Sequence, residues 1–337
     1  MKGSLKSMAF VVASSLVFAL GLQVWAVPLD GAAHLYAAER TGREARESVS
    51  EETSSSAQAN ASGSLPFAAR FRLVEGRGLL VNAWINGAGP FRLAIDTGAG
   101  ATLLSERVAQ AARVSYSTGR RTTIGGLSGK TTGAGREAKL ESLAIGDKNN
   151  FLPAQSSVVV TNSLPPDVDG LLDPTESYRP LGYTIDFPQG TISAFDPRTA
   201  PLRAGDASAG GAVVPWLFTG ASRRPFVSIE NGRRALIDTG SGLGLALGEA
   251  EAQAMGIIPR ARGRRPSELS DLGGGRVSAH RIAPVTVRVG SMSLRNVPTD
   301  LLYGAEAGAP IILGRDALYP FKLSFDPLNR LIRIEPR

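Results

Sequence analysis

The chain has 337 residues, of which 43% are apolar and 20% charged, a globular composition with room for two modest domains that argues against collagen, coiled coil and wholesale disorder. It contains no cysteine and only two histidines, so disulfides, thiolate metal sites, cysteine nucleophiles and histidine-rich metal sites are excluded. With 37 Lys and Arg against 30 Asp and Glu, the formal net charge is +7.

The first 26 residues have the features of a secretory signal peptide. Lys2 and Lys6 precede an apolar run over residues 8–22, and residues 24–26 (VWA) place small side chains where signal peptidase requires them. We therefore expect an exported protein, periplasmic or secreted. The apolar run is short for a membrane-spanning helix, so cleavage is favoured, and an uncleaved membrane anchor is the alternative.

Residues 27–64 are rich in Ser, Ala, Gly and Glu and poor in large apolar side chains, which predicts a flexible tether. A propeptide role is disfavoured because this segment lacks the basic and apolar content that would plug an acidic cleft. A second segment of similar composition, residues 197–212, divides the remainder in two. The expected lobes are residues 65–196 and 213–337, joined by this linker.

Within the first lobe, short apolar or alternating runs are separated by Gly, Pro, Asn and Asp, a pattern typical of β-strands. One helix per lobe is predicted, over residues 105–114, where Ser105 serves as the N-cap, and over 249–255. The fold class is therefore all-β. The expected strands of the first lobe cover residues 71–74, 79–85, 91–95, 156–160, 183–185 and 191–195.

The two lobes repeat one another in order. The sequence FRLAIDTGAG, which contains Asp96, is echoed by RRALIDTGSG, which contains Asp238, 142 positions later. Two further matches follow: AIG at 144–146 with RVG at 288–290, and GYTIDFP from 182 with KLSFDP from 322. The nearly constant offset indicates a duplicated domain.

Each repeat places an aspartate at the end of an apolar strand and follows it with Thr and Gly. The glycine permits a tight turn with close backbone approach, and the threonine hydroxyl can fix the loop. If the lobes pack about a pseudo-twofold axis, Asp96 faces Asp238. Two carboxyls that close share one proton, giving a base that activates water beside an acid that serves the substrate carbonyl.

With these motifs the chain resembles the aspartic proteases, specifically the tandem, exported bacterial form of the retropepsin-like domain, related to pepsin. The resemblance covers nearly everything after the tether. It implies two retropepsin-like β-barrel lobes related by a pseudo-twofold, with Asp96 and Asp238 as the catalytic pair of a peptide-cleaving enzyme. It also implies supporting and flap residues: Thr97, Gly98, Thr239, Gly240 and Gly314 around the catalytic loops, and Gly125, Gly126, Gly273 and Gly274 in the flap hairpins.

Two departures qualify this resemblance. The hydrophobic-hydrophobic-glycine element that ends at Gly314 in the second lobe has Asp173 in place of glycine in the first. Retroviral enzymes also carry an acid two places after Asp-Thr-Gly, where this chain has Gly100 and Gly242. The altered first lobe leaves open a non-catalytic protein that binds peptides.

Other functions are less well supported. The run from Gly240 to Gly244 lacks the context of a nucleotide-binding loop. No Gly-x-Ser-x-Gly elbow accompanies His280, so a serine hydrolase is not expected. The arginine cluster at 260–265 lacks interleaved aromatics, so nucleic-acid binding is not expected. We expect a peptide or protein substrate, no cofactor and no metal. A monomer is favoured because both aspartates lie on one chain, and a homodimer that pairs like lobes is the alternative.

Overall fold

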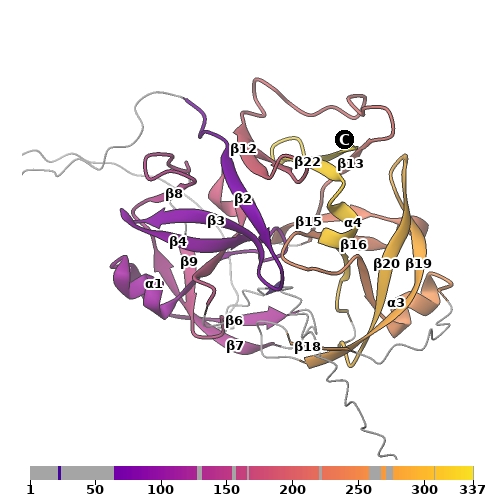
Figure 1. The fold of residues 1–337 in the computed structure, drawn as a ribbon, viewed down its shortest axis with the longest axis horizontal. Helices are drawn as coiled ribbons and strands as arrows, with labels where there is room; N and C mark the ends of the chain where they lie inside the picture. Colours follow the sequence, from indigo (N-terminus) through magenta and orange to yellow (C-terminus); the bar gives the residue numbers. More distant parts are fainter. Residues whose placement is uncertain are drawn as a thin grey trace, which may run out of the picture.

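The computed structural model describes residues 22–23, 64–126, 131–153, 157–164, 167–219, 222–257, 267–270, 276–306 and 308–336. Two β-rich lobes lie side by side, with the first lobe (indigo to magenta) on the left of Figure 1 and the second (orange to yellow) on the right. The prediction of a two-lobed all-β fold is confirmed.

The first lobe is built on an antiparallel meander of β2, β3 and β4. Alternate residues of β3 point inward, and Leu79, Val81, Ala83 and Ile85 are all almost fully buried, which is the period of two expected for a strand with one core face. The strands of this lobe that precede the linker are β2 (Ala69–Val74), β3 (Gly78–Ile85), β4 (Ala88–Ile95), β5 (Thr102–Ser105), β6 (Ser115–Gly126), β7 (Thr131–Lys139), β8 (Leu143–Ile145), β9 (Ser157–Thr161), β10 (Gly170–Leu172), β11 (Gly182–Asp186) and β12 (Thr191–Phe195).

The second lobe forms an eight-stranded sheet in the order β14-β15-β16-β21-β17-β20-β19-β18. The long hairpin of β19 and β20 dominates its outer side (Figure 1). The bounds are β13 (Ala212–Pro215), β14 (Leu217–Thr219), β15 (Ser222–Ser228), β16 (Arg234–Asp238), β17 (Leu245–Gly248), β18 (Ser267–Ser270), β19 (Arg276–Val289), β20 (Met292–Tyr303), β21 (Ile311–Gly314), β22 (Phe321–Asp326) and β23 (Leu331–Pro336), with a 3-10 turn at Glu230–Gly232.

The sheet topology repeats between the lobes as the sequence does. The strand that carries each aspartate has a parallel neighbour, β10 beside β4 and β21 beside β16. That neighbour pairs antiparallel with the next strand, β5 or β17, which in turn pairs parallel with β9 or β20. Two lobes with the same pattern of parallel and antiparallel pairs are the structural form of the repeat.

A shared sheet joins the lobes. β11 pairs antiparallel with β22, and the partners in that register differ by about the repeat offset, as at Thr184↔Ser324. The hydroxyls of Thr184 and Ser324 are 2.9 Å apart, and the rings of Tyr183 and Phe325 stack with centroids 4.6 Å apart. The lobes are thus held in one relative position by backbone pairing and buried aromatic packing.

Residues 197–211 connect β12 to β13 without a helix or strand. This connection is anchored in part: Leu202 is buried, and its main-chain N–H donates to the carboxylate of Asp326 on β22 (3.0 Å). The linker therefore packs against the shared sheet that joins the lobes.

Both predicted helices are present, somewhat shorter than expected, as α1 (Glu106–Ala111) and α3 (Glu249–Ala254). The Ser105 hydroxyl caps α1 by accepting from the N–H of Val108 (3.3 Å). Each lobe adds a four-residue helix, α2 (Pro174–Ser177) and α4 (Arg315–Leu318). A single turn is too short to show a helical period, which is why the sequence predicts only one helix per lobe.

The predicted signal peptide and tether lie outside the described residues except for Ser64 and β1 (Leu22–Gln23), which pairs antiparallel with Gly126 and Gly125 at the end of β6. Among the residues that the structure describes, none of the helices is long and apolar enough to cross a membrane.

Candidate active site

The two repeated aspartates occupy equivalent strand ends. Asp96 follows β4 directly, and its N–H donates to Leu172 at the end of β10 (2.9 Å). Asp238 is the last residue of β16 and lies in register with Gly314 of β21. Both carboxyl groups are fully buried. The parallel strand pairing therefore fixes each aspartate at the end of a strand in its own lobe.

Reciprocal hydrogen bonds join the two loops. The N–H of Thr97 donates to the hydroxyl of Thr239, and the N–H of Thr239 donates to the hydroxyl of Thr97, both at 3.1 Å. Each hydroxyl then donates across the interface, Thr97 to the carbonyl of Ile237 (2.7 Å) and Thr239 to that of Ile95 (3.0 Å). All four groups are buried, so the loops of the two lobes are held together by interlocked bonds that satisfy the N–H and the hydroxyl of both threonines.

The glycines after the threonines let the aspartates approach each other. A Cβ placed on Gly98 would lie 2.7 Å from Cγ of Asp238, and one on Gly240 would lie still closer to Cγ of Asp96. Each carboxyl therefore packs against the glycine of the opposite loop, where any side chain would displace it. The structure thus brings Asp96 and Asp238 together within one chain.

Burial and mutual charge shift the ionisation of both aspartates. Desolvation, followed by the negative charge of Asp238, raises the pKa of Asp96 well above its ordinary value. Desolvation also raises the pKa of Asp238, to about 6, although the N–H of Ser241 and the charge of Arg315 oppose that rise. A pair with two raised and unequal pKa values holds one proton between them at pH values above the lower pKa, that of Asp238 at about 6.

The element beneath each loop differs between the lobes, as the sequence indicated. Leu172 of β10 is in register with Ile95, whereas Leu313 of β21 is in register with Ile237, so Asp173 stands where the second lobe has Gly314. Asp173 is buried and caps α2 by accepting from the N–H of Thr175 (2.9 Å). Gly314 has no room for a side chain, because a Cβ there would overlap the carbonyl oxygen of Leu243.

Arg315 is a site residue to which the sequence analysis gave no role. It follows Gly314, is 7% exposed, and its Nη1 donates to the carbonyls of Thr239 (2.7 Å) and Gly240 (2.6 Å). The guanidinium lies beside Gly242, where retroviral enzymes carry an acid: a Cβ on Gly242 would lie 3.1 Å from Nη2. With glycine at that position, Arg315 binds the backbone of the loop. The arginine that directly follows the hydrophobic-hydrophobic-glycine element was the available signal in the sequence.

The expected flap residues are placed only in the first lobe. Gly125 and Gly126 end β6, which forms a hairpin with β7. Gly273 and Gly274 lie outside the described residues, between β18 and β19, the second-lobe strands that pair in the same way. The two hairpins therefore occupy corresponding positions in the lobes.

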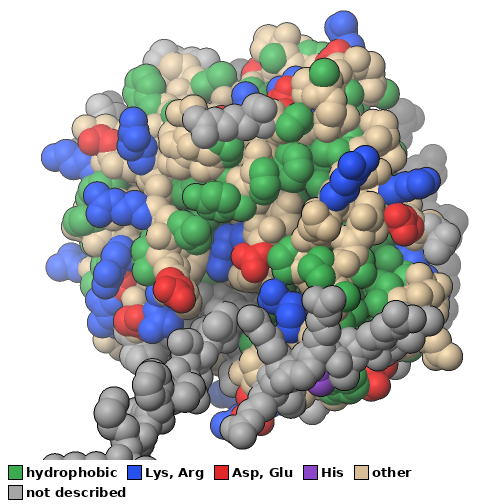
Figure 2. Space-filling model, turned by 45° about the vertical axis from the view of Figure 1, so that its right-hand side comes forward, with side chains coloured by type: hydrophobic (Ala, Val, Ile, Leu, Met, Phe, Trp, Pro, Cys, Tyr) green, Lys and Arg blue, Asp and Glu red, His purple; other side chains and the backbone are tan. Residues whose placement is uncertain are grey.

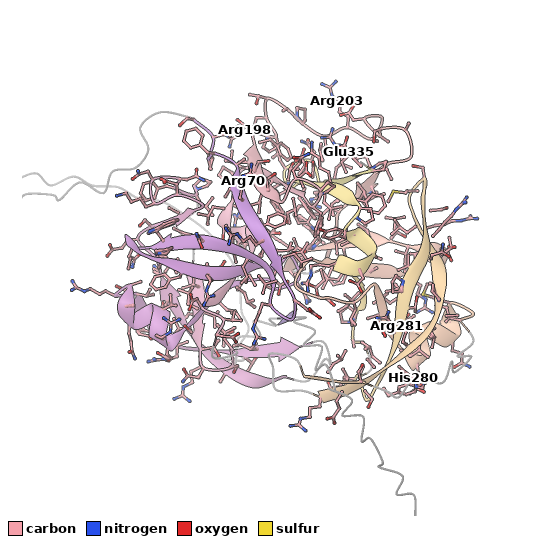
Figure 3. The ribbon with its side chains drawn as sticks, viewed as in Figure 1. Arg70, Arg198, Arg203, His280, Arg281 and Glu335 are labelled. Carbon is pink, nitrogen blue, oxygen red and sulfur yellow. The ribbon has the colours of Figure 1, made fainter. Side chains whose placement is uncertain are left out.

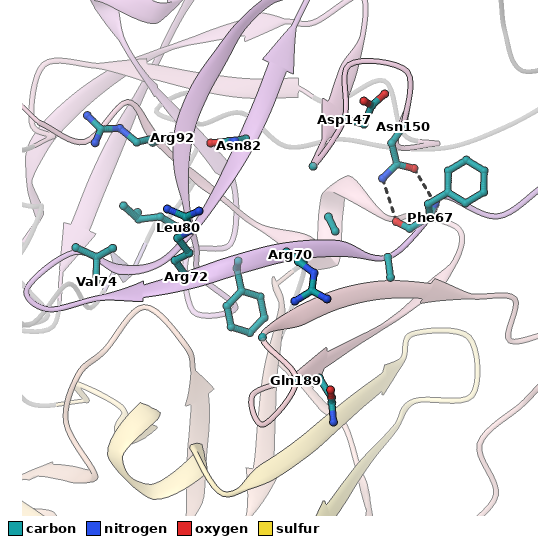
Figure 4. A pocket seen from close by; sticks show the side chains of 15 residues that line it. Phe67, Arg70, Arg72, Val74, Leu80, Asn82, Arg92, Asp147, Asn150 and Gln189 are labelled. Carbon is teal, nitrogen blue, oxygen red and sulfur yellow. Dashed lines mark hydrogen bonds between the residues drawn. The ribbon is translucent and has the colours of Figure 1, made fainter.

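The remaining candidates of the sequence lie elsewhere. His280 is on β19 in the second lobe (Figure 3), where its ring packs edge-on against that of Tyr303, with 6.2 Å between centroids. Basic, acidic and hydrophobic side chains are interspersed on the face of the molecule shown in Figure 2. A hollow of about 820 Å³ lies on the first lobe (Figure 4), and Arg70, Arg72 and Arg92 line it; it includes no residue of either Asp-Thr-Gly loop.

The sequence matches a known protein family, and the chain is similar to a solved structure. A family model described as "Aspartyl protease" matches residues 81–172 and 230–317, once in each lobe. No curated protein matches the chain. Among solved structures, the chain is similar to an aspartic proteinase from Irpex lacteus, with 14% sequence identity and a TM-score of 0.49 over 80% of this chain and 97% of that one.

Proposed function

Because the chain belongs to the aspartyl protease family, we propose that it is an aspartic endopeptidase whose single active site is formed by Asp96 and Asp238. The observation that carries this proposal is the interlocked pair of loops, in which two buried carboxyls of one chain each pack on the glycine of the opposite loop. Such a pair supplies both a base and an acid without a metal or a covalent intermediate.

The proposed reaction uses the shared proton twice. A water held between the carboxyls gives a proton to the ionised aspartate as its oxygen attacks the carbonyl carbon of the peptide, and the protonated aspartate donates its proton to the carbonyl oxygen. In the second step the C–N bond breaks: the leaving nitrogen receives a proton from the aspartate that was protonated by water, and a hydroxyl of the tetrahedral intermediate returns its proton to the other aspartate as the carboxylic acid product forms. Each carboxyl ends in the state in which it began.

The change beneath the first loop is compatible with this proposal. Although Asp173 replaces the expected glycine, β10 still pairs in register with β4, and Leu172 still accepts the N–H of Asp96. The altered residue turns its carboxylate toward the start of α2 rather than into the loop. We therefore favour catalysis over a peptide-binding protein without activity.

Substitution of each aspartate tests catalysis. Asp96→Asn and Asp238→Asn preserve size and most hydrogen bonds, and each is expected to lower cleavage of a peptide library by roughly a hundredfold or more, since proton transfer is lost. Asp206→Asn, in the exposed linker, is the matched control. Undiminished cleavage by the Asp238 variant would leave the peptide-binding alternative.

We also propose that the active form is a monomer, because both loops come from the same chain, and that it is exported after removal of residues 1–26. Sedimentation of the purified mature protein at the concentration of the assay tests the first point. An active species that sediments only as a dimer would favour a site between chains. N-terminal sequencing of the protein recovered from its host cells tests the second.

A further inference from the structure

The two catalytic loops are nearly identical in sequence, yet their surroundings differ. We infer that Arg315 acts as a positioning residue which, with the backbone N–H of Ser241, assigns the negative charge of the dyad to Asp238 and its proton to Asp96. This inference rests on the proposed function and adds to it the separate role of each aspartate.

The first difference is in backbone donors. Oδ1 of Asp238 accepts from two N–H groups, those of Gly240 (2.8 Å) and Ser241 (3.0 Å). Oδ1 of Asp96 accepts from Gly98 (2.8 Å), whereas the next N–H, that of Ala99, is directed to the main-chain oxygen of Asp96 (3.4 Å). Because hydrogen bonds to a carboxylate favour its ionised form, the extra donor stabilises charge on Asp238.

The second difference is a buried cation. Arg315 is fixed beneath the second loop by its bonds to the carbonyls of Thr239 and Gly240. Its electrostatic interaction with Asp238 is stronger than that with Asp96. In the first lobe the same position is Pro174, which follows Asp173 as Arg315 follows Gly314. The permanent positive charge of Arg315 therefore acts mainly on Asp238. The equivalent residue in the first lobe, Pro174, carries no charge that could act on Asp96.

The third difference is a buried acid. Asp173 is 1% exposed, and burial, with the charge of Glu176, raises its pKa to about 8. Asp173 is therefore protonated below that pH and adds no negative charge beside Asp96 there. The asymmetry of the dyad comes instead from the second lobe, from Arg315 and the N–H of Ser241.

The other charged groups facing this site do not reverse the assignment. Arg224 extends from β15 and is buried; it interacts with Asp238 more strongly than with Asp173 or Asp96. Asp316 on α4 acts on Arg315 and is itself influenced by Arg281 and Asp300. Both cations thus favour the ionised form of Asp238, which becomes the base that accepts the proton of water, while Asp96 is the acid that serves the substrate carbonyl.

Carboxyl NMR of the mature protein tests the assignment without requiring activity. In protein labelled with ¹³C at the aspartate side chains, the resonance that Asp238→Asn removes is expected to titrate near pH 6, and the one that Asp96→Asn removes is expected to titrate at a higher pH. The opposite assignment would overturn the inference. If peptides are not cleaved but the assignment holds, the proposed catalysis fails and the inference stands.

The role of Arg315 is tested by the pH profile of kcat/KM. Arg315→Met is expected to move the acidic limb to higher pH, with about a tenfold loss at pH 5 and a smaller loss at the optimum, and Arg315→Lys is expected to restore the limb in part. Arg281→Met, which breaks the partly exposed ion pair with Asp300 in the same lobe, serves as a control for destabilisation alone. If the Arg315 and Arg281 variants lose activity equally at every pH, Arg315 is only structural.

Discussion

At the residue scale, identical triplets acquire different properties from single neighbours. Gly314 and Asp173 occupy the same place under the two loops, but one is enclosed by the backbone of residues 241–243 and the other caps a helix. The position therefore tolerates a side chain only where the surrounding backbone leaves room for it. This difference is invisible in the triplets themselves.

Gly314→Ala is expected to destabilise the protein by about 2 kcal/mol or more and to reduce cleavage, because the added methyl overlaps the Leu243 carbonyl and nothing there can yield cheaply. The measurement is urea unfolding together with peptide cleavage. Gly205→Ala, in the exposed linker, is the matched control, since no heavy atom lies within 4 Å of its Cβ. Equal stability of the two variants would contradict the steric argument.

Thr97→Val is expected to cost about 2–4 kcal/mol of unfolding free energy, because it removes a buried donor to Ile237 and a buried acceptor for the N–H of Thr239. Cleavage should fall as well, since the loops lose their mutual support. Thr97→Ser keeps the hydroxyl and should restore most of both properties. A serine variant as damaged as the valine variant would show that the methyl group, rather than the hydrogen bonds, matters.

At the element scale, short helices complete strands that already position the site. α1 follows β5 and lies on the side of its lobe away from the second lobe (Figure 1), where the Ser105 cap and Glu106 in the first turn satisfy its N-terminus. α3, its equivalent, begins at Gly248 and has no side-chain cap. The two helices therefore differ in how firmly their first turns are held.

Ser105→Ala is expected to lower the unfolding free energy by about 1 kcal/mol through loss of the cap, with cleavage unchanged below the melting transition. Gly248→Ser, which supplies a capping hydroxyl to α3, is expected to raise stability by a few tenths of a kcal/mol. Thermal unfolding of both variants measures the contrast. A neutral Ser105 variant would mean that α1 depends on packing alone.

At the scale of the whole molecule, buried carboxyls link stability to pH. Asp96, Asp173 and Asp238 all have pKa values raised above those of an unfolded chain. The folded state therefore binds more protons than the unfolded state between about pH 4 and the folded pKa values, so stability falls as pH rises through this range. A protein built in this way is most stable in mildly acidic conditions.

Asp173→Asn separates this effect from catalysis. Asparagine keeps an oxygen that can accept the N–H of Thr175 but cannot ionise, so the variant should lack the part of the decline that Asp173 contributes between pH 5 and 8, on the order of 1 kcal/mol per pH unit. Urea unfolding across this range measures the two slopes. Parallel slopes would show that Asp173 is not protonated in the folded protein.

The sequence by itself determined the duplication, the all-β class and the identity of the paired aspartates. Strand periodicity and an in-order repeat are local or translational features, and a single chain displays them fully. The helices α1 and α3 were also predictable, because each spans enough residues to show its pattern and, in α1, its cap.

Only the tertiary structure decided how the lobes meet. The interlocked threonines, the packing of each carboxyl on the opposite glycine, and the fixed place of Arg315 depend on contacts between residues about 75 to 144 positions apart. The pKa values follow from that arrangement, because desolvation and charge act through space rather than along the chain. The sequence thus supplied the two halves of the site, and the packing of the lobes made them unequal.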